Sequence, residues 1–357
     1  MRLAITTASA NDAISFNYAA RKLRALMGRL GEVVDDPAKA DLQVYHGSPE
    51  WEVRRSLARQ GRRFVLYAPV ESTRVLPRWV RLAEACDALW CHTDFTARVW
   101  RDCGYRGRLS VVQNGVDPED FPLRNGAAVL QDEGETASET DGGAGLRVLW
   151  IGTRAGHATA ARRGFKTGCR KQGWLVREAF EAANLPGSRL LLKGYPWPSP
   201  EKDMTFHGPG FLGGDGWVTV RDVAAWWSRE ELVSAMHWAD VLMWPTRGEG
   251  FGLVPLEAMA TGLCAYVTDW SGPVDYLRDG LGRPLAPSGL RPALQSSRRG
   301  EDAEVALGTI VEALRECDAH KAGLQAEGLR FADLVRERWT WEGRVLPQLE
   351  AAVVAVL

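Results

Sequence analysis

The chain has 357 residues, a formal net charge of −1 and 25% charged residues. This length is sufficient for two domains with hydrophobic cores of their own. The near-zero charge indicates no general affinity for nucleic acid or membranes, and no apolar stretch is long enough for a transmembrane segment. The six cysteines show no C-x-x-C pair and no metal-ligand spacing. We therefore expect a cytoplasmic protein with reduced thiols, no metal and no cofactor.

The first third of the chain alternates short β-rich runs with amphipathic segments. The predicted strands cover residues 2–6, 42–45, 64–67, 88–91 and 109–112, and examples of predicted helices are 16–30 and 95–103. This alternation predicts a parallel sheet whose ligands bind at the carboxyl ends of the strands. His46, Glu71 and His92 follow such strand ends and are candidates for acceptor binding. A salt-bridged loop carboxylate explains Glu71 equally well, and strand-end histidines are often buried polar residues of the core.

Residues 124–145 interrupt this pattern. They are acidic, rich in small residues and without aromatic side chains. Such a composition cannot bury enough apolar surface to order itself, so it predicts a flexible linker at a domain boundary.

A second domain begins with the predicted strand 146–152. The following stretch contains six basic residues and no acidic one, which are Arg154, Arg162, Arg163, Lys166, Arg170 and Lys171. It is either a solvated basic loop or a clamp for phosphate groups. We favour the clamp, because the stretch follows a strand end that faces the same cleft.

The remaining elements continue the strand–helix alternation. A predicted strand at 190–194 carries Lys193, and Ser228 caps a helix that extends to Trp238, with acidic residues in its first turn. A strand is expected at 264–268, helices from about residues 301 and 321, and a terminal amphipathic helix at 342–356.

The stretch around Glu249 is the centre of this arrangement. The buried strand 241–244 ends at Pro245, and a glycine-bearing loop then opens a helix with Pro255 in its first turn and Gly262 as its C-terminal cap. The amides of about residues 251–254 are left unpaired at the positive end of the helix dipole, where a phosphate or a sugar hydroxyl can bind. Glu249 lies before this helix and Glu257 inside it.

The run PTRGEGFGLVPLEAMATG, residues 245–262, resembles the E-x7-E signature of family-4 retaining glycosyltransferases. The resemblance implies that Glu249 contacts the transferred sugar and that Glu257 binds the ribose hydroxyls of the donor. The loop and helix start between them would hold sugar and diphosphate; the donor-binding candidates are Gly250, Phe251, Gly252, Leu253, Glu257 and Lys193.

Other segments are similar to the same family. The run 71–80, ESTRVLPRWV, resembles a motif of its acceptor-binding domain, and residues 112–117, VQNGVD, resemble a second one. Arg154 and Lys171 are the nearest matches to the Arg and Lys that clamp the diphosphate, although Gln172 stands between Lys171 and Gly173. The resemblance therefore implies catalytic roles for Glu249, Arg154, Lys171 and Glu71. One departure is the loop 9–15, which replaces the usual Gly-Gly loop after the first strand.

The implied fold is α/β of the GT-B type, with two Rossmann-like doubly wound domains facing across a cleft. The expected boundaries are an acceptor domain at 1–123, the linker at 124–145, a nucleotide-sugar donor domain at 146–338 and a C-terminal helix at 339–357 that packs back on the first domain.

The implied activity is retaining transfer of a sugar from a nucleotide-diphosphate-sugar donor to an unidentified hydroxyl acceptor. Since the chain has no D-x-D pair, we expect no catalytic metal. The alternatives are a DNA glycosyltransferase acting on a hydroxymethylated base, which makes nucleic acid a possible acceptor, a nucleotide-sugar epimerase, and a non-catalytic sugar-binding module.

Overall fold

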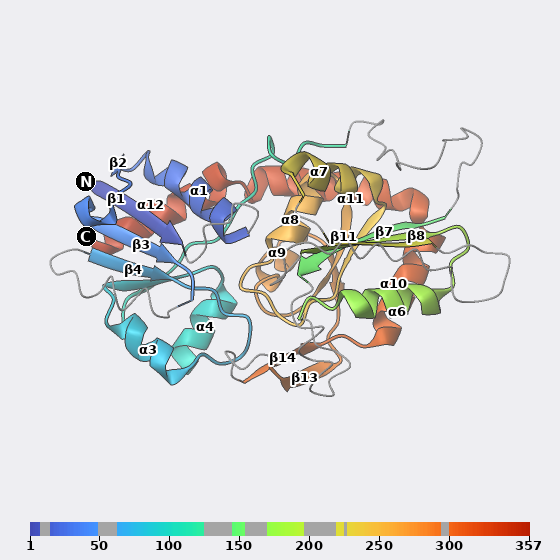
Figure 1. Ribbon diagram of the computed structural model, residues 1–357, viewed down its shortest axis with the longest axis horizontal. Helices are drawn as coiled ribbons and strands as arrows, with labels where there is room; N and C mark the ends of the chain where they lie inside the picture. Colours follow the sequence, from blue (N-terminus) through green and yellow to red (C-terminus); the bar gives the residue numbers. More distant parts are fainter. Residues whose placement is uncertain are drawn as a thin grey trace.

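The computed structural model describes residues 1–7, 15–48, 63–124, 145–153, 170–195, 219–224, 227–293 and 300–357. The expected linker at 124–145 lies outside these residues except at its two ends, and so does the loop 9–15 except for its last residue. Arg154, Arg162, Arg163 and Lys166 of the basic stretch also lie outside them. Figure 1 shows two α/β domains side by side, each with its own sheet.

The N-terminal sheet has six strands, and all its pairings are parallel. Their spatial order is β2 (Glu32–Val33), β1 (Arg2–Thr7), β3 (Leu42–His46), β4 (Arg63–Tyr67), β5 (Ala88–Cys91) and β6 (Leu109–Val111). The connecting helices are α1 (Ser15–Met27), η1 (Pro37–Lys39), α3 (Pro77–Glu84) and α4 (Asp94–Asp102). The five strands other than β2 agree with the sequence-based expectation within one or two residues at each end, whereas β2 was not predicted.

Successive side chains of β4 and β5 enter different cores. Val65, Tyr67 and Trp90 pack into the large core that continues into the second domain. Leu66 and Leu89 pack into a smaller core under α3 and α4. A parallel sheet that is buried on both faces requires such continuous apolar strands, which is why they stand out in the sequence.

The second sheet also has six strands, again all parallel. In spatial order they are β12 (Arg283–Leu285), β11 (Cys264–Thr268), β10 (Val241–Trp244), β7 (Arg147–Thr153), β8 (Arg189–Tyr195) and β9 (Thr219–Ala224). The helices of this domain are α6 (Gly173–Ala183), α7 (Arg229–Trp238), α8 (Leu253–Ala260), α9 (Val274–Arg278), α10 (Leu307–Ala319) and α11 (Lys321–Arg338). The predicted Ser228 cap of α7 is confirmed as a capping box with Glu231.

The helix expected from about residue 301 is wrong at its start. Residues Glu301–Glu304 form β14, which pairs antiparallel with β13 (Gly289–Pro292), and α10 begins only at Leu307. The reason is tertiary: Asp302 of β14 is fully buried and forms an ion pair with Arg247 at 2.5 Å. Nothing in the local sequence reveals that distant partner.

The C-terminal segment crosses back to the N-terminal sheet, as Figure 1 shows. It forms the π-helical turn η2 (Trp341–Val345) and α12 (Leu346–Val356). The Gln348 side chain accepts a hydrogen bond from the backbone N–H of Gln113 at 2.8 Å, and Arg63 donates to the carbonyl oxygen of Leu357 at 2.9 Å. The last helix therefore links the C-terminal domain to the N-terminal one. Among the described residues, no helix is both long enough and apolar enough to cross a membrane.

Candidate functional site

The loop between β10 and α8 is fixed through its backbone. The N–H of Glu249 donates to the Ser271 hydroxyl at 2.9 Å, and the Gly272 N–H donates to the Glu249 carbonyl at 3.0 Å. Ser271 has a φ of 60°, in the left-handed region that favours glycine. This strained turn holds the Glu249 backbone at a defined place.

Helix α8 begins at Leu253, directly after Gly252, whose φ of 95° is a glycine conformation. Among the described residues, the amides of Phe251 and Gly252 have no hydrogen-bond acceptor. They lie at the positive end of the helix dipole, so an anionic or hydroxyl-bearing ligand can accept their hydrogen bonds. The side chains of Phe251 and Leu253 are buried, which leaves their backbone as the group available to a ligand.

Gly250 lies at a close approach of the two domains. A β-carbon on it would stand 2.7 Å from the ring of Pro69 in the N-terminal domain. Its carbonyl oxygen accepts a hydrogen bond from the Thr93 hydroxyl at 3.3 Å. The glycine-bearing loop therefore also forms part of the domain contact.

Four charged side chains meet at Glu249. Its carboxylate lies 2.5 Å from a guanidinium nitrogen of Arg170 and 2.6 Å from the ammonium of Lys171. Arg170 also contacts the Glu71 carboxylate at 2.8 Å. Glu71 belongs to the N-terminal domain, so Arg170 bridges one predicted site residue from each domain. The structure thus brings Glu249, Lys171 and Glu71 together.

The charge of Glu249 is maintained by this cluster. Its side chain is only 7% exposed, and burial by itself would raise its pKa. The charges of Arg170 and Lys171 outweigh that effect, and the net pKa lies below the ordinary glutamate value. Glu249 is therefore a buried carboxylate that stays ionised.

Backbone contacts place the two cations. The Arg247 N–H donates to the Arg170 carbonyl at 2.9 Å, and the indole N–H of Trp150 donates to the Lys171 carbonyl at 2.8 Å. The Lys171 ammonium lies 4.5 Å from the centre of the Trp244 ring. Sequence analysis did not single out Arg170, because one arginine in a basic run carries no distinguishing signal until its partners are known.

Glu257 lies within α8, whereas Glu249 lies in the loop before this helix. The two glutamates have different charged neighbours. Glu257 is buried, with Arg229 at 3.6 Å. Burial raises its pKa to about 7, although Arg229 opposes the shift. The Arg229 guanidinium lies 4.3 Å from the centre of the Tyr18 ring on α1. Arg229 was also missed by sequence analysis, since nothing in its local sequence reveals that it faces the cleft.

Lys193 of β8 is fully buried, and burial lowers its pKa to about 7. Its ammonium lies 5.3 Å from the centre of the Trp227 ring. Its proposed contact with the donor stays a prediction. The role of Arg154 does as well, because this residue lies outside the described part of the chain.

His46 and His92 lie in the interior of the N-terminal domain. Their Nε2 atoms are 2.9 Å apart, and both rings stack on Tyr67, with centroid distances of 4.6 and 4.0 Å. Burial and the neighbouring His46 hold the pKa of His92 well below its usual value. The structure therefore gives both histidines a packed environment, and their contact with an acceptor stays a prediction.

Solved structures with the same architecture are glycosyltransferases. Sucrose-phosphate synthase from Thermosynechococcus elongatus superimposes with a TM-score of 0.67 over 100% of both chains, at 14% identity. α,α-Trehalose 6-phosphate synthase from Burkholderia multivorans gives 0.57 over 96% of this chain and 76% of its own, at 13% identity. TarM gives 0.58 over 95% and 58%, at 10% identity. At such identities the likeness concerns the fold, which is GT-B as expected from the sequence.

No protein with a curated description matches the sequence. One family model does: "Family 4 Glycosyltransferase in conflict systems" matches residues 120–346, which is more than half of the chain and includes Lys171, Glu249 and Glu257. This match agrees with the E-x7-E motif and with the arrangement of the two domains, and the chain therefore belongs to the family 4 glycosyltransferases of conflict systems.

Proposed function

We propose that this protein transfers a sugar from a nucleotide-diphosphate-sugar to a hydroxyl acceptor, with retention of configuration at the anomeric carbon. The observation that carries the proposal is the buried, ionised Glu249 beside Arg170, Lys171 and the free amides that precede α8. This combination would offer cations and amides to a leaving diphosphate and a carboxylate to the transferred sugar.

The chemistry follows from these groups. A leaving diphosphate gains negative charge, which Arg170, Lys171 and the start of α8 would stabilise without a metal. Because both cations are already in contact with Glu249, they are oriented before the donor arrives. Glu257, at the other end of the site, would accept hydrogen bonds from the ribose hydroxyls. The family resemblance implies attack from the face of the leaving group, with the leaving phosphate taking the proton of the acceptor.

A glycosidase-type mechanism is a poor match for the two glutamates. Retaining glycosidases need two carboxyl groups about 5 Å apart on either side of one bond. Glu249 lies in the loop before α8, and Glu257 lies within that helix, paired with a different arginine. The environments differ in charge as well, which supports separate roles for the transferred sugar and for the ribose.

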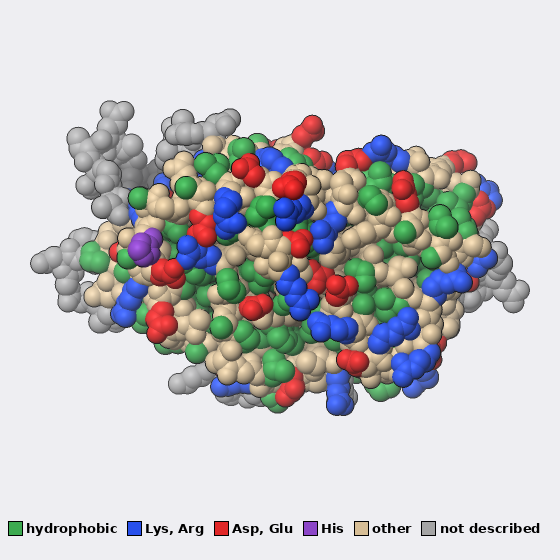
Figure 2. All heavy atoms as spheres, turned by 180° about the vertical axis from the view of Figure 1, so that it is seen from behind, with side chains coloured by type: hydrophobic (Ala, Val, Ile, Leu, Met, Phe, Trp, Pro, Cys, Tyr) green, Lys and Arg blue, Asp and Glu red, His purple; other side chains and the backbone are tan. Residues whose placement is uncertain are grey.

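The acceptor is the open part of the proposal, and DNA is one candidate. The basic residues that suggest it, Arg162, Arg163 and Lys166, lie outside the described residues. On the face drawn in Figure 2, basic and acidic side chains are interspersed over most of the surface. Titration with fluorescent duplex DNA at two salt concentrations tests this candidate, since binding through several phosphates weakens steeply with salt.

The test of the function is a panel of nucleotide-sugars, each incubated with the protein in the presence of a chelator. We expect release of nucleoside diphosphate from one donor, and the anomeric configuration of the sugar product, determined by NMR, to match that donor. A released, altered nucleotide-sugar would instead identify an epimerase. Binding without any turnover across the panel and a set of acceptors would favour the non-catalytic module and contradict the proposal.

A further inference from the structure

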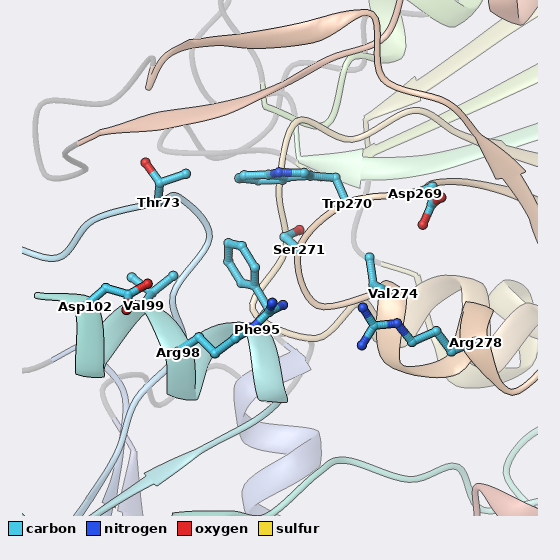
Figure 3. Close-up of a pocket in the computed structure, with 10 residues that line it drawn as sticks. All are labelled: Thr73, Phe95, Arg98, Val99, Asp102, Asp269, Trp270, Ser271, Val274 and Arg278. Atoms are coloured by element: carbon cyan, nitrogen blue, oxygen red, sulfur yellow. The ribbon is translucent and has the colours of Figure 1, made fainter.

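A cavity lies between the two domains, and the four charged side chains of the Glu249 cluster do not line it. Its volume is about 460 Å³, within the range of small-molecule sites. The N-terminal domain contributes residues of α4 and Thr73, and the C-terminal domain contributes residues 269–278 (Figure 3). A ligand bound here would therefore contact both domains at once.

The cavity has an aromatic wall. Phe95 of α4 and Trp270, which follows β11, meet edge to face, with ring centroids 5.1 Å apart. Both side chains remain partly exposed. Large rings of this kind gain stability from further burial, which a bound ligand would supply. Exposed aromatic faces in a cavity suit the apolar face of a sugar ring.

Two arginines extend into the same space. Arg98 comes from α4 and Arg278 from the end of α9, and in Figure 3 their guanidinium groups approach each other from opposite sides. Both side chains are exposed, and neither forms a salt bridge with a residue that the structure describes. Two guanidinium groups without a salt bridge can donate several hydrogen bonds to one phosphate or carboxylate.

Two carboxylates also line the cavity. Asp102 and Asp269 lie toward its opposite ends in Figure 3, away from the space between the guanidinium groups. Carboxylates at these positions can accept hydrogen bonds from hydroxyl groups. The lining therefore combines ring contact, anion binding and hydroxyl binding.

The cavity shares its wall with the proposed active site. Ser271 lines it and accepts the hydrogen bond from the Glu249 backbone N–H. A β-carbon on Gly248 would meet the ring of Trp270 at 2.7 Å and the Glu71 carbonyl oxygen at 2.1 Å. A ligand in the cavity would thus contact residues that adjoin the loops of Glu71 and Glu249.

The geometry points to a ligand site in this cavity for a sugar that bears a phosphate or a carboxylate. By contacting both domains, such a ligand stabilises the arrangement in which Arg170 bridges Glu71 and Glu249. Any effect of this ligand on sugar transfer rests on the proposed function, whereas its binding to the cavity does not.

Binding is measured by titration calorimetry without donor, using glucose 6-phosphate, glucuronate and uncharged glucose as probes. We expect one or both of the charged sugars to bind and glucose to bind far more weakly. The variant R98A/R278A should weaken binding of the charged probe by about tenfold or more, because charge-assisted hydrogen bonds are lost. Arg81→Ala, at an exposed arginine on α3 outside the cavity, is the matched control and should leave the affinity unchanged.

The same affinity in R98A/R278A and in the wild type, or no binding of either charged probe, would overturn the site. Repeating the titration with Glu249→Gln separates binding in the cavity from catalysis. The charged probe should still bind to this variant even if the variant has no turnover. Mass spectrometry after addition of donor then shows whether the bound sugar is an acceptor or an effector. A glycosylated probe is an acceptor, and an unmodified probe that changes the rate of donor hydrolysis is an effector.

Discussion

The two domains use the carboxyl ends of their parallel strands in opposite ways. In the N-terminal domain, His46 and His92 stack on the Tyr67 ring, and burial holds the pKa of His92 well below its usual value. In the C-terminal domain, the loop after β10 carries an ionised carboxylate with two cations in contact. Neutral rings tolerate burial with one hydrogen bond between them, whereas a buried charge requires opposite charges nearby. Of these two groups of side chains, only the second contains opposite charges in direct contact.

Glu257 stands between these two cases. It is buried like the histidines, and it has one cation at 3.6 Å where Glu249 has two at shorter range. Burial consequently dominates at Glu257 and raises its pKa to about 7, while the cations dominate at Glu249 and lower its pKa. The number and distance of cations thus decide in which direction the pKa of each buried glutamate is shifted.

The largest expected effect is on Glu249, where the charged site can be broken directly. Glu249→Gln keeps the shape of the side chain and removes its charge. Transfer should fall on the order of 100-fold or more, because a group that contacts the reacting sugar is lost. The measurement is turnover with the donor identified in the panel. Glu178→Gln, at an exposed position of α6, is the control, and wild-type turnover in Glu249→Gln would contradict the assignment.

Glu257→Gln tests the intermediate case through stability. The folded-state pKa of Glu257, about 7, exceeds the unfolded value of 4.5, so the folded state binds the proton more tightly. Stability from this group is complete below pH 4.5 and is lost as pH rises through 7. The variant should therefore gain stability over wild type at pH 8, on the order of 2–3 kcal/mol at most, and little at pH 5.

Chemical denaturation at the two pH values measures this difference. Donor affinity supplies the independent readout, because the ribose hydroxyls need an ionised carboxylate as acceptor. In the wild type it should increase as pH rises through 7, and the variant should lose that dependence. An equal stability difference at both pH values would show that Glu257 does not titrate in this range.

Arg170→Lys tests whether the positive charge of Arg170 is sufficient or whether its planar geometry is also needed. Lysine keeps the positive charge but cannot contact Glu71 and Glu249 at the same time with a planar fork. We expect donor affinity to fall by about tenfold, since a charge-assisted contact is worth at least 1.5 kcal/mol. Equilibrium binding of the donor measures it, with Arg177→Lys on the exposed face of α6 as control. Unchanged affinity would show that the charge alone suffices.

The smallest expected effect concerns the neutral stack. The pKa of His92 is held well below 6.5 in the folded state, so its contribution to stability is present above pH 6.5 and is lost as pH falls below it. The free energy of unfolding should therefore decrease as pH falls from 6.5. His92→Phe keeps the ring on Tyr67 and should flatten this part of the stability profile, measured by denaturation. A profile parallel to that of the wild type would mean that His92 is protonated in the folded protein.

The sequence by itself determined much of the fold and the centre of the site. Buried parallel strands are continuous apolar runs, so the strands around β10 and β11 were predicted to the residue. The α8 region was predicted as well, because the cap at Gly262 and the backbone at Gly252 depend on local conformation. Glu249 and Glu257 were singled out because residues 245–262 resemble the E-x7-E signature, and their roles stay predictions.

Only the tertiary structure decided which charges meet. Arg170 lies 79 positions from Glu249 in the chain, and Arg229 faces Glu257 across a different pair of elements. It was also tertiary pairing, of Asp302 with Arg247, that made a strand of the segment predicted as a helix. Local preferences fix the backbone over a few residues, but the partner of a buried charge is chosen by the packing of distant segments.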